Sequence, residues 1–345
     1  MSTHCPRVRV LCLPDVDRAI GGVKQLYRHV EHLVALGWDA AIVTQNPTFR
    51  PSWFESTAPS LSLRESWEKG ELDVSSCVLL VPETYLTATW KDFWGIDLSA
   101  IAKVVFNQNA YYTYGSHEDC SLVSLSSFYD DPSVLHVLSI SEDTHHFLNH
   151  SLAIPDYRLT RIVNAIEPIF RFDQVKENRL HWMPRKNPDH VQAILLGMQR
   201  SGLRNSKGWI AEPLQNLSHQ DVAYYLNKSR IFLSFGHPEG FGLPIAEAMA
   251  AGCWVVGYSG GGGDELFRYG ASYQVSFGDW SGFLRGIQDA LDAFTTRSRE
   301  TDLRLRRQAL AVSSLYSIDQ ERASIKIAWE SIAKAFFAYH SNLTK

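Results

Sequence analysis

Apolar residues occur along the chain in two patterns. Some form short continuous runs, and others recur with helical spacing over longer segments. "VRVLCLP" (8–14) is a short β-branched run, typical of a buried strand. From Gly21 to Gly37, apolar residues recur three and four positions apart, which predicts a helix that ends at Gly37. "AAIVTQ" (40–45) then predicts a second buried strand. This order of strand, helix and strand indicates a parallel α/β sheet.

The same alternation continues along the chain. We expect further strands at 77–83, 103–109, 134–141, 157–165, 180–184, 208–214, 230–235 and 253–258, and helices at about 188–200, 218–228 and 244–251. The region 46–76 is rich in Pro, Ser and Trp and predicts an irregular surface with at most one short helix. The last segment, 317–340, predicts a long amphipathic helix whose apolar stripe must pack on another element; the stripe comprises Ile325, Ala328, Trp329, Ile332 and Phe336.

The length of the chain predicts two domains. A chain of 345 residues exceeds the size at which one hydrophobic core usually keeps growing. The polar segment 166–179 contains Pro168 and lacks a clean period, so it is the best candidate for a linker. We therefore expect an N-terminal domain over 1–167 and a C-terminal domain over 178–318, both doubly wound α/β domains.

Charge and composition exclude several classes of function. The formal net charge of −4 provides no broad basic field for a nucleic-acid backbone. The Arg-rich stretch 297–307 is interrupted by Glu300 and Asp302 and predicts a solvated helix face, with an RNA or anionic-lipid patch as the alternative. The five cysteines are scattered without metal-ligand spacing, and the chain shows no membrane-spanning run and no apolar leader. We expect a cytoplasmic protein, with peripheral membrane association left open, and no metal site.

The stretch "HPEGFGLPIAEAMAAGCWVVGYSGGGGDE" (237–265) carries the candidate chemistry. Glu239 and Glu247 lie on either side of a glycine turn, and Pro244 suits the first turn of a helix. Such a helix start binds phosphate oxygens, because its N–H groups lack intrahelical partners. Carboxylates repel phosphate but accept hydrogen bonds from hydroxyl groups. A nucleotide sugar, with hydroxyls at both ends and a diphosphate between them, fits both requirements.

The step of eight residues from Glu239 to Glu247 resembles the E-x7-E signature of family 4 glycosyltransferases. "GGVKQLYRHVEHLVALGWDAAIVTQ", "VNAIEPIF" and "MPRKN" also resemble pieces of that family. The resemblance implies a GT-B fold, in which two Rossmann-like domains face each other across a cleft and the last helix, about 320–345, crosses back to the N-terminal domain. It implies transfer of a sugar from a nucleotide donor with retention, without a metal ion or a cofactor, to a sugar-containing, lipid-linked or small-molecule acceptor.

The resemblance also assigns roles to residues near the donor. Glu247 would accept hydrogen bonds from the ribose, and the donor sugar and its surroundings would be contacted by Glu239, Gly240, Phe241, Gly242, Leu243, Gly261 and Gly262. The leaving diphosphate gains negative charge, and without a metal ion fixed cations must stabilise it. Arg185 and Lys186, just after a predicted strand, are the candidates.

The N-terminal half contributes further candidates. Gly21 and Gly22 start the first helix, where N–H groups can contact the diphosphate or the acceptor. The family commonly has a phosphate-binding Lys about five residues after the Arg, whereas Arg185 and Lys186 are adjacent here. It also often has a His in a loop where this chain has "NQNAYYTYG" (107–115), so Asn109 and Tyr111 are the candidates on the sugar or acceptor side.

Simpler interpretations of these residues remain open. Glu247 could be a first-turn carboxylate that stabilises its helix, and Glu239 an ordinary loop charge. The glycines at 260–263 could form a tight turn, and Arg185 with Lys186 a surface pair. The tyrosines at 111, 112 and 114 could serve loop packing. At the level of function, the alternatives are a phosphorylase or epimerase of the same fold, or a nucleotide-sugar-binding protein without transfer activity.

Overall fold

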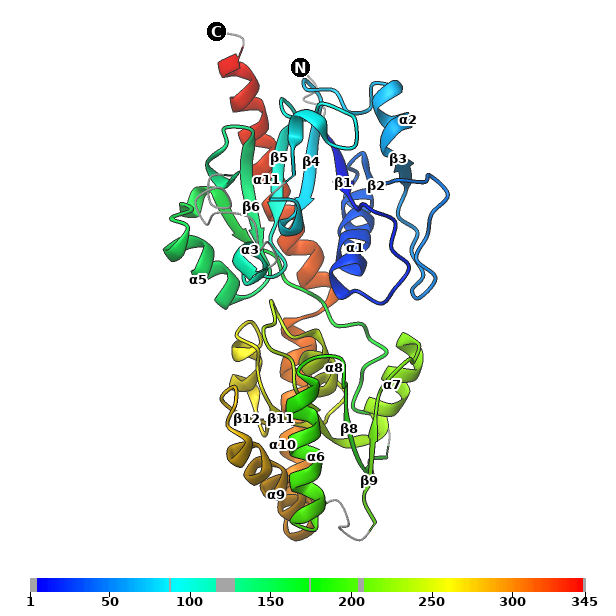
Figure 1. Cartoon of the computed structure of the whole chain (residues 1–345), viewed down its shortest axis with the longest axis vertical. Coiled ribbons are helices and arrows are strands. Elements are labelled where there is room, and N and C mark those ends of the chain that lie inside the picture. Colours follow the sequence, from blue (N-terminus) through cyan, green and yellow to red (C-terminus); the bar gives the residue numbers. More distant parts are fainter. Residues whose placement is uncertain (1–4, 87, 116–127, 174, 204–207, 344–345) are drawn as a thin grey trace. The chain divides into compact units, whose positions relative to one another are not determined.

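The computed structural model describes residues 5–86, 88–115, 128–173, 175–203 and 208–343. The chain divides into two compact units (Figure 1): unit 1 comprises Met1–Val163 and Glu321–Lys345, and unit 2 comprises Asn164–Gln320. Each unit has its own parallel sheet and its own core. The α/β class predicted from the spacing of apolar residues is therefore confirmed.

Unit 1 is built on a parallel sheet of seven strands. Its strands are β1 (Arg7–Leu11), β2 (Ala40–Thr44), β3 (Ser60–Ser62), β4 (Cys77–Pro82), β5 (Ala102–Phe106), β6 (Val134–Ser139) and β7 (Leu159–Arg161). Its helices are α1 (Gly21–Ala35), α2 (Leu63–Glu68), α3 (Tyr112–Gly115), α5 (Glu142–Ser151) and, from Glu321 on, α11 (Ile318–Leu343). Short 3₁₀ turns are η1 (Glu83–Tyr85), η2 (Trp90–Asp92), η3 (Phe128–Asp130) and η4 (Asp156–Arg158).

The strand order of unit 1 is β3-β2-β1-β4-β5-β6-β7. After β1 the chain turns to one side to form β2 and β3, and it then crosses over to form β4 on the other side. The point between β1 and β4 is therefore a topological switch point. In open parallel sheets, ligands bind at such points, outside the carboxyl ends of the strands.

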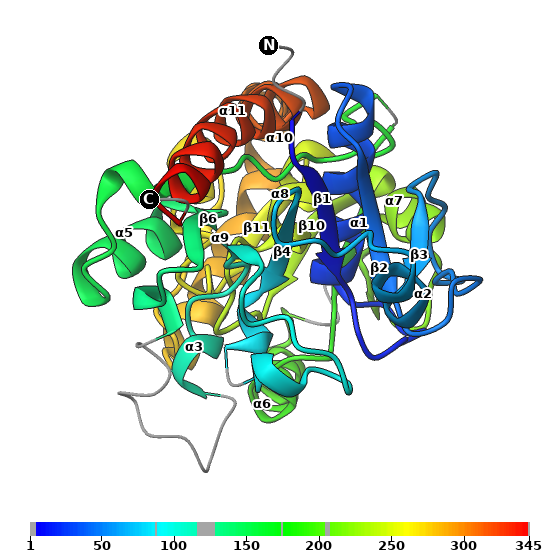
Figure 2. The same ribbon diagram turned by 90° about the horizontal axis from the view of Figure 1, so that it is seen from above.

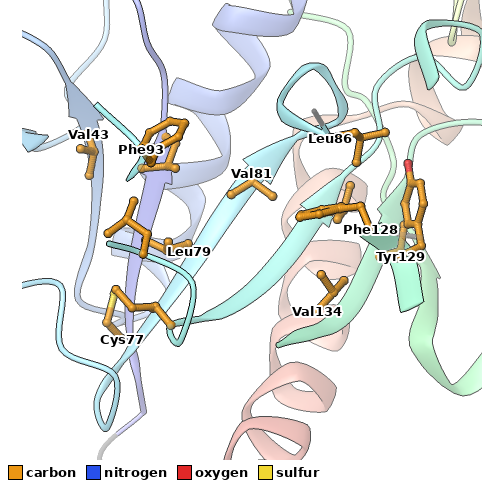
Figure 3. Close-up of a cluster of buried hydrophobic side chains, with 14 of the residues drawn as sticks. Val43, Cys77, Leu79, Val81, Leu86, Phe93, Phe128, Tyr129 and Val134 are labelled. Atoms are coloured by element: carbon orange, nitrogen blue, oxygen red, sulfur yellow. The ribbon is translucent and has the colours of Figure 1, made fainter. Parts of the chain in front are cut away.

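A buried hydrophobic cluster covers one face of this sheet (Figure 3). Leu79 and Val81 of β4 lie among Leu86, Phe93 and Phe128, which come from the connecting segments. The region 46–76, expected to be irregular with one short helix, contains α2 and also the short strand β3, which the pattern did not predict. β3 has only three residues, too few to show a period of two.

The C-terminal helix α11 lies beside α1 in unit 1 (Figure 2). All five residues of the predicted apolar stripe are at most 1% exposed. Trp329 donates its indole N–H to His29 Nε2 of α1 at 2.7 Å, and Glu321 accepts from Arg28 at 2.6 Å. The amphipathic pattern therefore predicted both the helix and its need for a partner.

Unit 2 contains a parallel sheet of five strands in the order β12-β11-β10-β8-β9. Its strands are β8 (Glu177–Trp182), β9 (Ile210–Pro213), β10 (Ser229–Ser234), β11 (Trp254–Gly257) and β12 (Tyr273–Gln274). Its helices are α6 (Pro188–Arg200), α7 (His219–Lys228), α8 (Leu243–Ala250), α9 (Trp280–Thr296) and α10 (Ser298–Leu315), with the 3₁₀ turn η6 (Asp264–Tyr269). The switch point of this sheet lies between β8 and β10.

The segment expected to be a linker packs on unit 2. Ile166 and Phe170 are buried, and the backbone N–H of Arg171 donates to Asn227 at 2.9 Å. Lys176, whose pKa is lowered by burial, donates to the Leu226 carbonyl at 3.2 Å. The last three residues of the segment, 177–179, already belong to β8. The segment is therefore not a free tether, because its few apolar residues and its lysine have partners that only the folded unit provides.

Candidate functional site

The candidate site of unit 2 is built where β8 and β10 end. Trp182 of β8 pairs with Leu233 of β10, so the segments that follow the two strands leave the sheet at its switch point. The first segment carries Arg185 and Lys186 into α6, and the second carries Glu239 into α8. The sequence predicted that these segments provide the site, and the topology brings them together.

Lys186 and Glu239 form an ion pair across this point. Lys186 Nζ lies 2.9 Å from Glu239 Oε1 and donates to the Pro238 carbonyl at 2.6 Å. Their side chains are 19% and 20% exposed, so the pair is partly shielded from water. The sequence did not distinguish the roles of Arg185 and Lys186. In the structure, Lys186 holds the Glu239 loop, whereas Arg185 is exposed to solvent.

Asn187 is a supporting residue that the sequence analysis missed. It adopts left-handed backbone angles (φ 50°, ψ 55°) before α6, which Asn tolerates better than most residues. Its side-chain amide donates to the Phe235 carbonyl at 2.7 Å and to the His237 carbonyl at 3.0 Å. Asn187 therefore fixes the start of the loop that carries Glu239. The signal in the sequence was the Asn-Pro pair that opens the helix.

The Glu239 loop is hydrogen-bonded to the glycine-rich loop that follows β11. The Glu239 N–H donates to the Gly260 carbonyl at 2.8 Å, and the Gly262 N–H donates to the Glu239 carbonyl at 3.0 Å. A Cβ atom on Gly262 would lie 2.0 Å from the Gly240 carbonyl oxygen. The glycines were expected to bring backbone close to a ligand or to form a turn. What the structure shows is that Gly262 allows two protein loops to pack backbone against backbone.

Helix α8 begins at Leu243, with Pro244 in its first turn as predicted. No side chain caps this helix, because its N-cap residue is Gly242, in a left-handed conformation with φ of 84°. Glu247 is the fifth residue of α8 and half-buried, and the first turn contains no acidic residue. The interpretation of Glu247 as a first-turn carboxylate is therefore wrong.

The remaining backbone candidates lie between these residues. Gly240, Phe241 and Gly242 are buried, and the Phe241 ring packs on Tyr316 with centroids 5.1 Å apart. The Phe241 side chain is therefore part of the core of unit 2, and only its backbone can serve a ligand. Leu243 is half-buried and Gly261 has a positive φ of 89°.

A pocket of about 340 Å³ adjoins the glycine-rich loop. Its walls include polar side chains that bond to one another: Gln274 Nε2 donates to Asp264 Oδ1 at 2.7 Å and to Ser259 Oγ at 3.1 Å. His237 and Phe277 also line the pocket, and their rings stack with centroids 4.1 Å apart. Burial, and secondarily the charge of Lys186, lower the pKa of His237, so its neutral form is favoured.

The carboxyl edge of the unit 1 sheet carries the N-terminal candidates. Gly21 and Gly22 are the first two residues of α1, which no side chain caps. Asn109 is 6% exposed, and its side-chain oxygen accepts the Tyr111 N–H at 3.1 Å. The Tyr111 ring is 37% exposed, and its hydroxyl donates to Asp143 at 3.2 Å. Asn109 therefore shapes the loop that presents Tyr111.

Glu83 is a buried carboxylate at this edge that the sequence analysis missed. It follows β4 directly and is 3% exposed. Its Oε2 accepts the Gln108 N–H at 2.9 Å, and the Gln108 side chain donates to the Gly22 carbonyl at 3.2 Å. Burial raises the pKa of Glu83 to about 7, against the opposing effect of backbone N–H groups. The sequence signal was an acidic residue at the end of a buried strand.

Other predictions concern metals, thiols and membranes. Within the ranges that the structure describes, no cluster of three or more His, Cys, Asp or Glu side chains could hold a metal ion. Cys5, Cys12, Cys77 and Cys253 are free thiols, whereas Cys120 lies outside the described residues.

No helix in the described part of the chain has both the length and the apolar character to cross a bilayer. The Arg-rich stretch 297–307 lies mainly in α10, and its arginines are exposed.

Comparison with known proteins places a defined domain in unit 2. Residues 212–308 match the family model of Glycosyl transferases group 1. An Alpha-1,6-glucosyltransferase of Actinobacillus pleuropneumoniae serotype 7 (strain AP76) is 34% identical over 87 residues, which is 24% of this chain and 26% of that enzyme. The chain thus aligns with about a quarter of the length of this curated relative.

Solved structures resemble the whole chain in fold. A sucrose-phosphate synthase of Thermosynechococcus elongatus has a TM-score of 0.64 at 12% identity, covering 98% of this chain and 99% of that chain. The Anabaena protein HepE in complex with UDP-glucose has a TM-score of 0.68 at 11% identity, covering 94% and 100%. WaaG, a glycosyltransferase involved in lipopolysaccharide biosynthesis, has a TM-score of 0.59 at 13% identity, covering 94% and 98%. The chain therefore has the GT-B fold of two Rossmann-like units, and residues 212–308 carry a Glycosyl transferases group 1 domain.

Proposed function

We propose that this protein is a glycosyltransferase that moves a sugar from a nucleotide-activated donor to an acceptor hydroxyl, with retention at the anomeric carbon and without a metal ion. One observation carries the proposal: the Lys186–Glu239 ion pair bridges the switch point of unit 2. Glu239 lies within the stretch that matches Glycosyl transferases group 1, and Lys186 precedes that stretch. A ligand is expected at this point of an open parallel sheet. The residues gathered there suit a ligand with both hydroxyls and phosphates.

The donor is held by two kinds of group. Glu247 accepts hydrogen bonds from the ribose hydroxyls, and Glu239 accepts them from the sugar, because carboxylates are strong acceptors and repel phosphate. The diphosphate lies between them, at the uncapped start of α8, where backbone N–H groups and the helix dipole favour anions. Polar side chains of the adjoining pocket, Gln274 and Ser259, supply further partners for sugar hydroxyls.

The reaction requires stabilisation of a leaving anion. The bond between the anomeric carbon and the diphosphate oxygen breaks, and the acceptor oxygen forms a new bond on the same face while its proton passes to the leaving phosphate. Arg185, which is exposed beside the switch point, donates to the diphosphate as negative charge develops on it. Lys186 contributes positive charge and keeps the Glu239 carboxylate in place for the sugar.

The acceptor side is assigned to unit 1 in this proposal. Gly21 and Gly22 offer N–H groups at the uncapped start of α1, and Tyr111 presents a partly exposed ring from the neighbouring loop. We extend the proposal to a sugar-containing or lipid-linked acceptor and to a cytoplasmic protein that associates peripherally with membranes. Flotation of the purified protein with vesicles containing anionic lipids checks the membrane part, and protein that stays in the dense fraction contradicts it.

A donor screen tests the central part of the proposal. UDP-, GDP-, ADP- and dTDP-sugars are each added to the full chain, and the thermal midpoint is measured. A donor at about 100 times its dissociation constant adds about 2.7 kcal/mol to stability, so one nucleotide class should raise the midpoint by several degrees. UDP-glucose is the first donor to examine, since HepE, which shares the fold, was solved with it. If none of the four classes shifts the midpoint, the proposal fails.

Product analysis separates transfer from its alternatives. With the donor identified, NMR of the product reports the anomeric configuration, and the same rate in the presence of EDTA reports metal independence. Activity that depends on inorganic phosphate would instead indicate a phosphorylase, and interconversion of the sugar on the nucleotide an epimerase. Binding without transfer or slow donor hydrolysis would indicate a nucleotide-sugar-binding protein.

A further inference from the structure

Three backbone segments of unit 1 are linked at the carboxyl edge of its sheet by the hydrogen bonds of Glu83 and Gln108. They are the start of α1, the end of β4 and the segment that follows β5. Glu83 comes from the second segment and accepts the backbone N–H of Gln108 from the third at 2.9 Å. Gln108 in turn donates its side-chain amide to the Gly22 carbonyl of the first at 3.2 Å.

The geometry leaves little room for these segments to move independently. A Cβ atom on Gly22 would lie 3.3 Å from Gln108 Oε1, which is tighter than an ordinary contact. Gln108 is therefore packed directly against the first turn of α1. The next residue, Asn109, accepts the Tyr111 N–H through its side-chain oxygen at 3.1 Å. A shift of Gln108 must consequently move both the start of α1 and the loop that presents Tyr111.

Burial destabilises the charged form of Glu83 at this position. It is 3% exposed, burial raises its pKa, and only backbone N–H groups, those of Gln108, Asn109 and Glu83 itself, oppose the shift. A core that needed only apolar packing would be more stable with an apolar side chain here. The carboxylate accepts hydrogen bonds from backbone N–H groups of the segment after β5, which lose this acceptor when Glu83 is replaced by an apolar side chain.

We propose that Glu83 is a positioning residue of the acceptor side: through Gln108 it sets the relative placement of Gly22 and of the loop from Asn109 to Tyr111. The inference rests on the proposed function, since the acceptor is assigned to unit 1. It concerns a residue that touches no substrate and acts through Gln108. Its consequence is that Glu83 governs how well an acceptor hydroxyl is presented, while the donor site of unit 2 is left unaltered.

Amide hydrogen–deuterium exchange tests the positioning role without any substrate. Glu83→Ala, Glu83→Gln and Gln108→Ala are prepared in the full chain. Lys103→Met serves as the matched control, because Lys103 is equally buried and lies near the opposite end of β5, where it donates to the Ile101 carbonyl at 2.8 Å. In Glu83→Ala, amides of residues 107–113 and 21–25 should exchange at least about ten-fold faster, because their anchor is lost.

Two further variants, Glu83→Gln and Gln108→Ala, distinguish loss of the hydrogen bond from general loss of folding. Glu83→Gln keeps a side-chain oxygen as acceptor and should return the exchange rates to within about three-fold of the wild type. Should Glu83→Ala fail to fold, Gln108→Ala decides, because it keeps the backbone N–H and removes only the link to Gly22; faster exchange at 21–25 is then expected. Unchanged exchange in these segments, or the same local increase in Lys103→Met, overturns the inference.

Kinetics provide the functional readout. With UDP-glucose as donor and p-nitrophenyl β-glucoside and β-galactoside as acceptor probes, Glu83→Ala should raise the acceptor KM by about ten-fold and leave the donor KM within about two-fold, with rescue in Glu83→Gln. Equal changes in both KM values would contradict a role confined to the acceptor side. If the wild-type protein transfers from no nucleotide sugar, the proposed function fails, whereas the exchange measurement still decides the role of Glu83.

Discussion

The two units join neighbouring strand ends at the carboxyl edges of their sheets with different chemistry. In unit 2, Lys186 and Glu239 form an ion pair in which each side chain is about one-fifth exposed. In unit 1, the Glu83 carboxylate is almost fully buried and accepts from backbone N–H groups. A partly exposed carboxylate with a cation beside it can exchange partners with a ligand at small cost, whereas a buried one cannot. The first arrangement suits contact with substrate and the second suits placement of backbone.

The largest effect expected from this contrast is on turnover. Glu239→Gln should lower kcat by about 100-fold, because a charged acceptor at the reacting sugar is lost, while the free energy of unfolding changes by less than about 1 kcal/mol. Glu177→Gln is the matched control, since Glu177 is also ion-paired, with Arg179, but begins β8 at the opposite edge of the sheet. Steady-state kinetics and chemical denaturation check both variants. Equal kcat losses in the two variants would refute the assignment of Glu239.

The second effect concerns the loops that hold Glu239. Gly262→Ala should destabilise unit 2 by about 2–3 kcal/mol and weaken donor binding, because its Cβ would lie 2.0 Å from the Gly240 carbonyl oxygen. Gly278→Ala is the control for backbone strain alone, since Gly278 has a φ of 85° and open space around its Cβ position. Thermal unfolding with and without UDP measures both. If Gly262→Ala lowers the stability less than Gly278→Ala does, the Glu239 loop and the glycine-rich loop are not tightly packed.

The third effect is a dependence of stability on pH that originates in unit 1. The pKa of Glu83 is raised from its ordinary value of 4.5 to about 7, so the folded protein binds a proton that the unfolded chain releases. The contribution of this group to stability is complete below pH 4.5 and is lost as the pH rises to 7. Relative to Glu83→Gln, the wild type should therefore lose on the order of 2 kcal/mol between pH 5 and pH 8. Urea denaturation across this range measures it, and a constant difference between the two proteins would contradict the burial argument.

The smallest effect is on donor affinity. Glu247→Ala should weaken binding of the nucleotide by about ten-fold, or about 1.4 kcal/mol, because hydrogen bonds to the ribose hydroxyls are lost while the diphosphate contacts remain. Glu330 is a suitable control, since it is an exposed helical carboxylate of α11 paired with Lys326. Isothermal titration with UDP compares Glu247→Ala with Glu330→Ala. Unaltered affinity in the first variant would argue against the ribose contact.

Sequence patterns and tertiary structure contributed different parts of this picture. The 3.6-residue and strand-like spacings predicted α1, α6, α7, α8, α11 and most strands, including α6 with its bounds at 188 and 200, because these elements bury one continuous face. The long helix α9 was not predicted. The same local reasoning found Glu239, Glu247 and the glycine run, which are adjacent in sequence. β3 and β12 were not predicted, since strands of three and two residues show no period and depend on pairing with β2 and β11.

What the sequence alone determined was the set of chemical groups and the order of the elements; what only the tertiary structure decided was which groups meet. Lys186 pairs with Glu239 across 53 residues, and Glu83 reaches Gln108 across 25. Both contacts exist because crossover connections bring distant strand ends to one edge of a sheet. Local spacing carries no information about such contacts, because the free energy that creates them comes from burying each sheet between its helices.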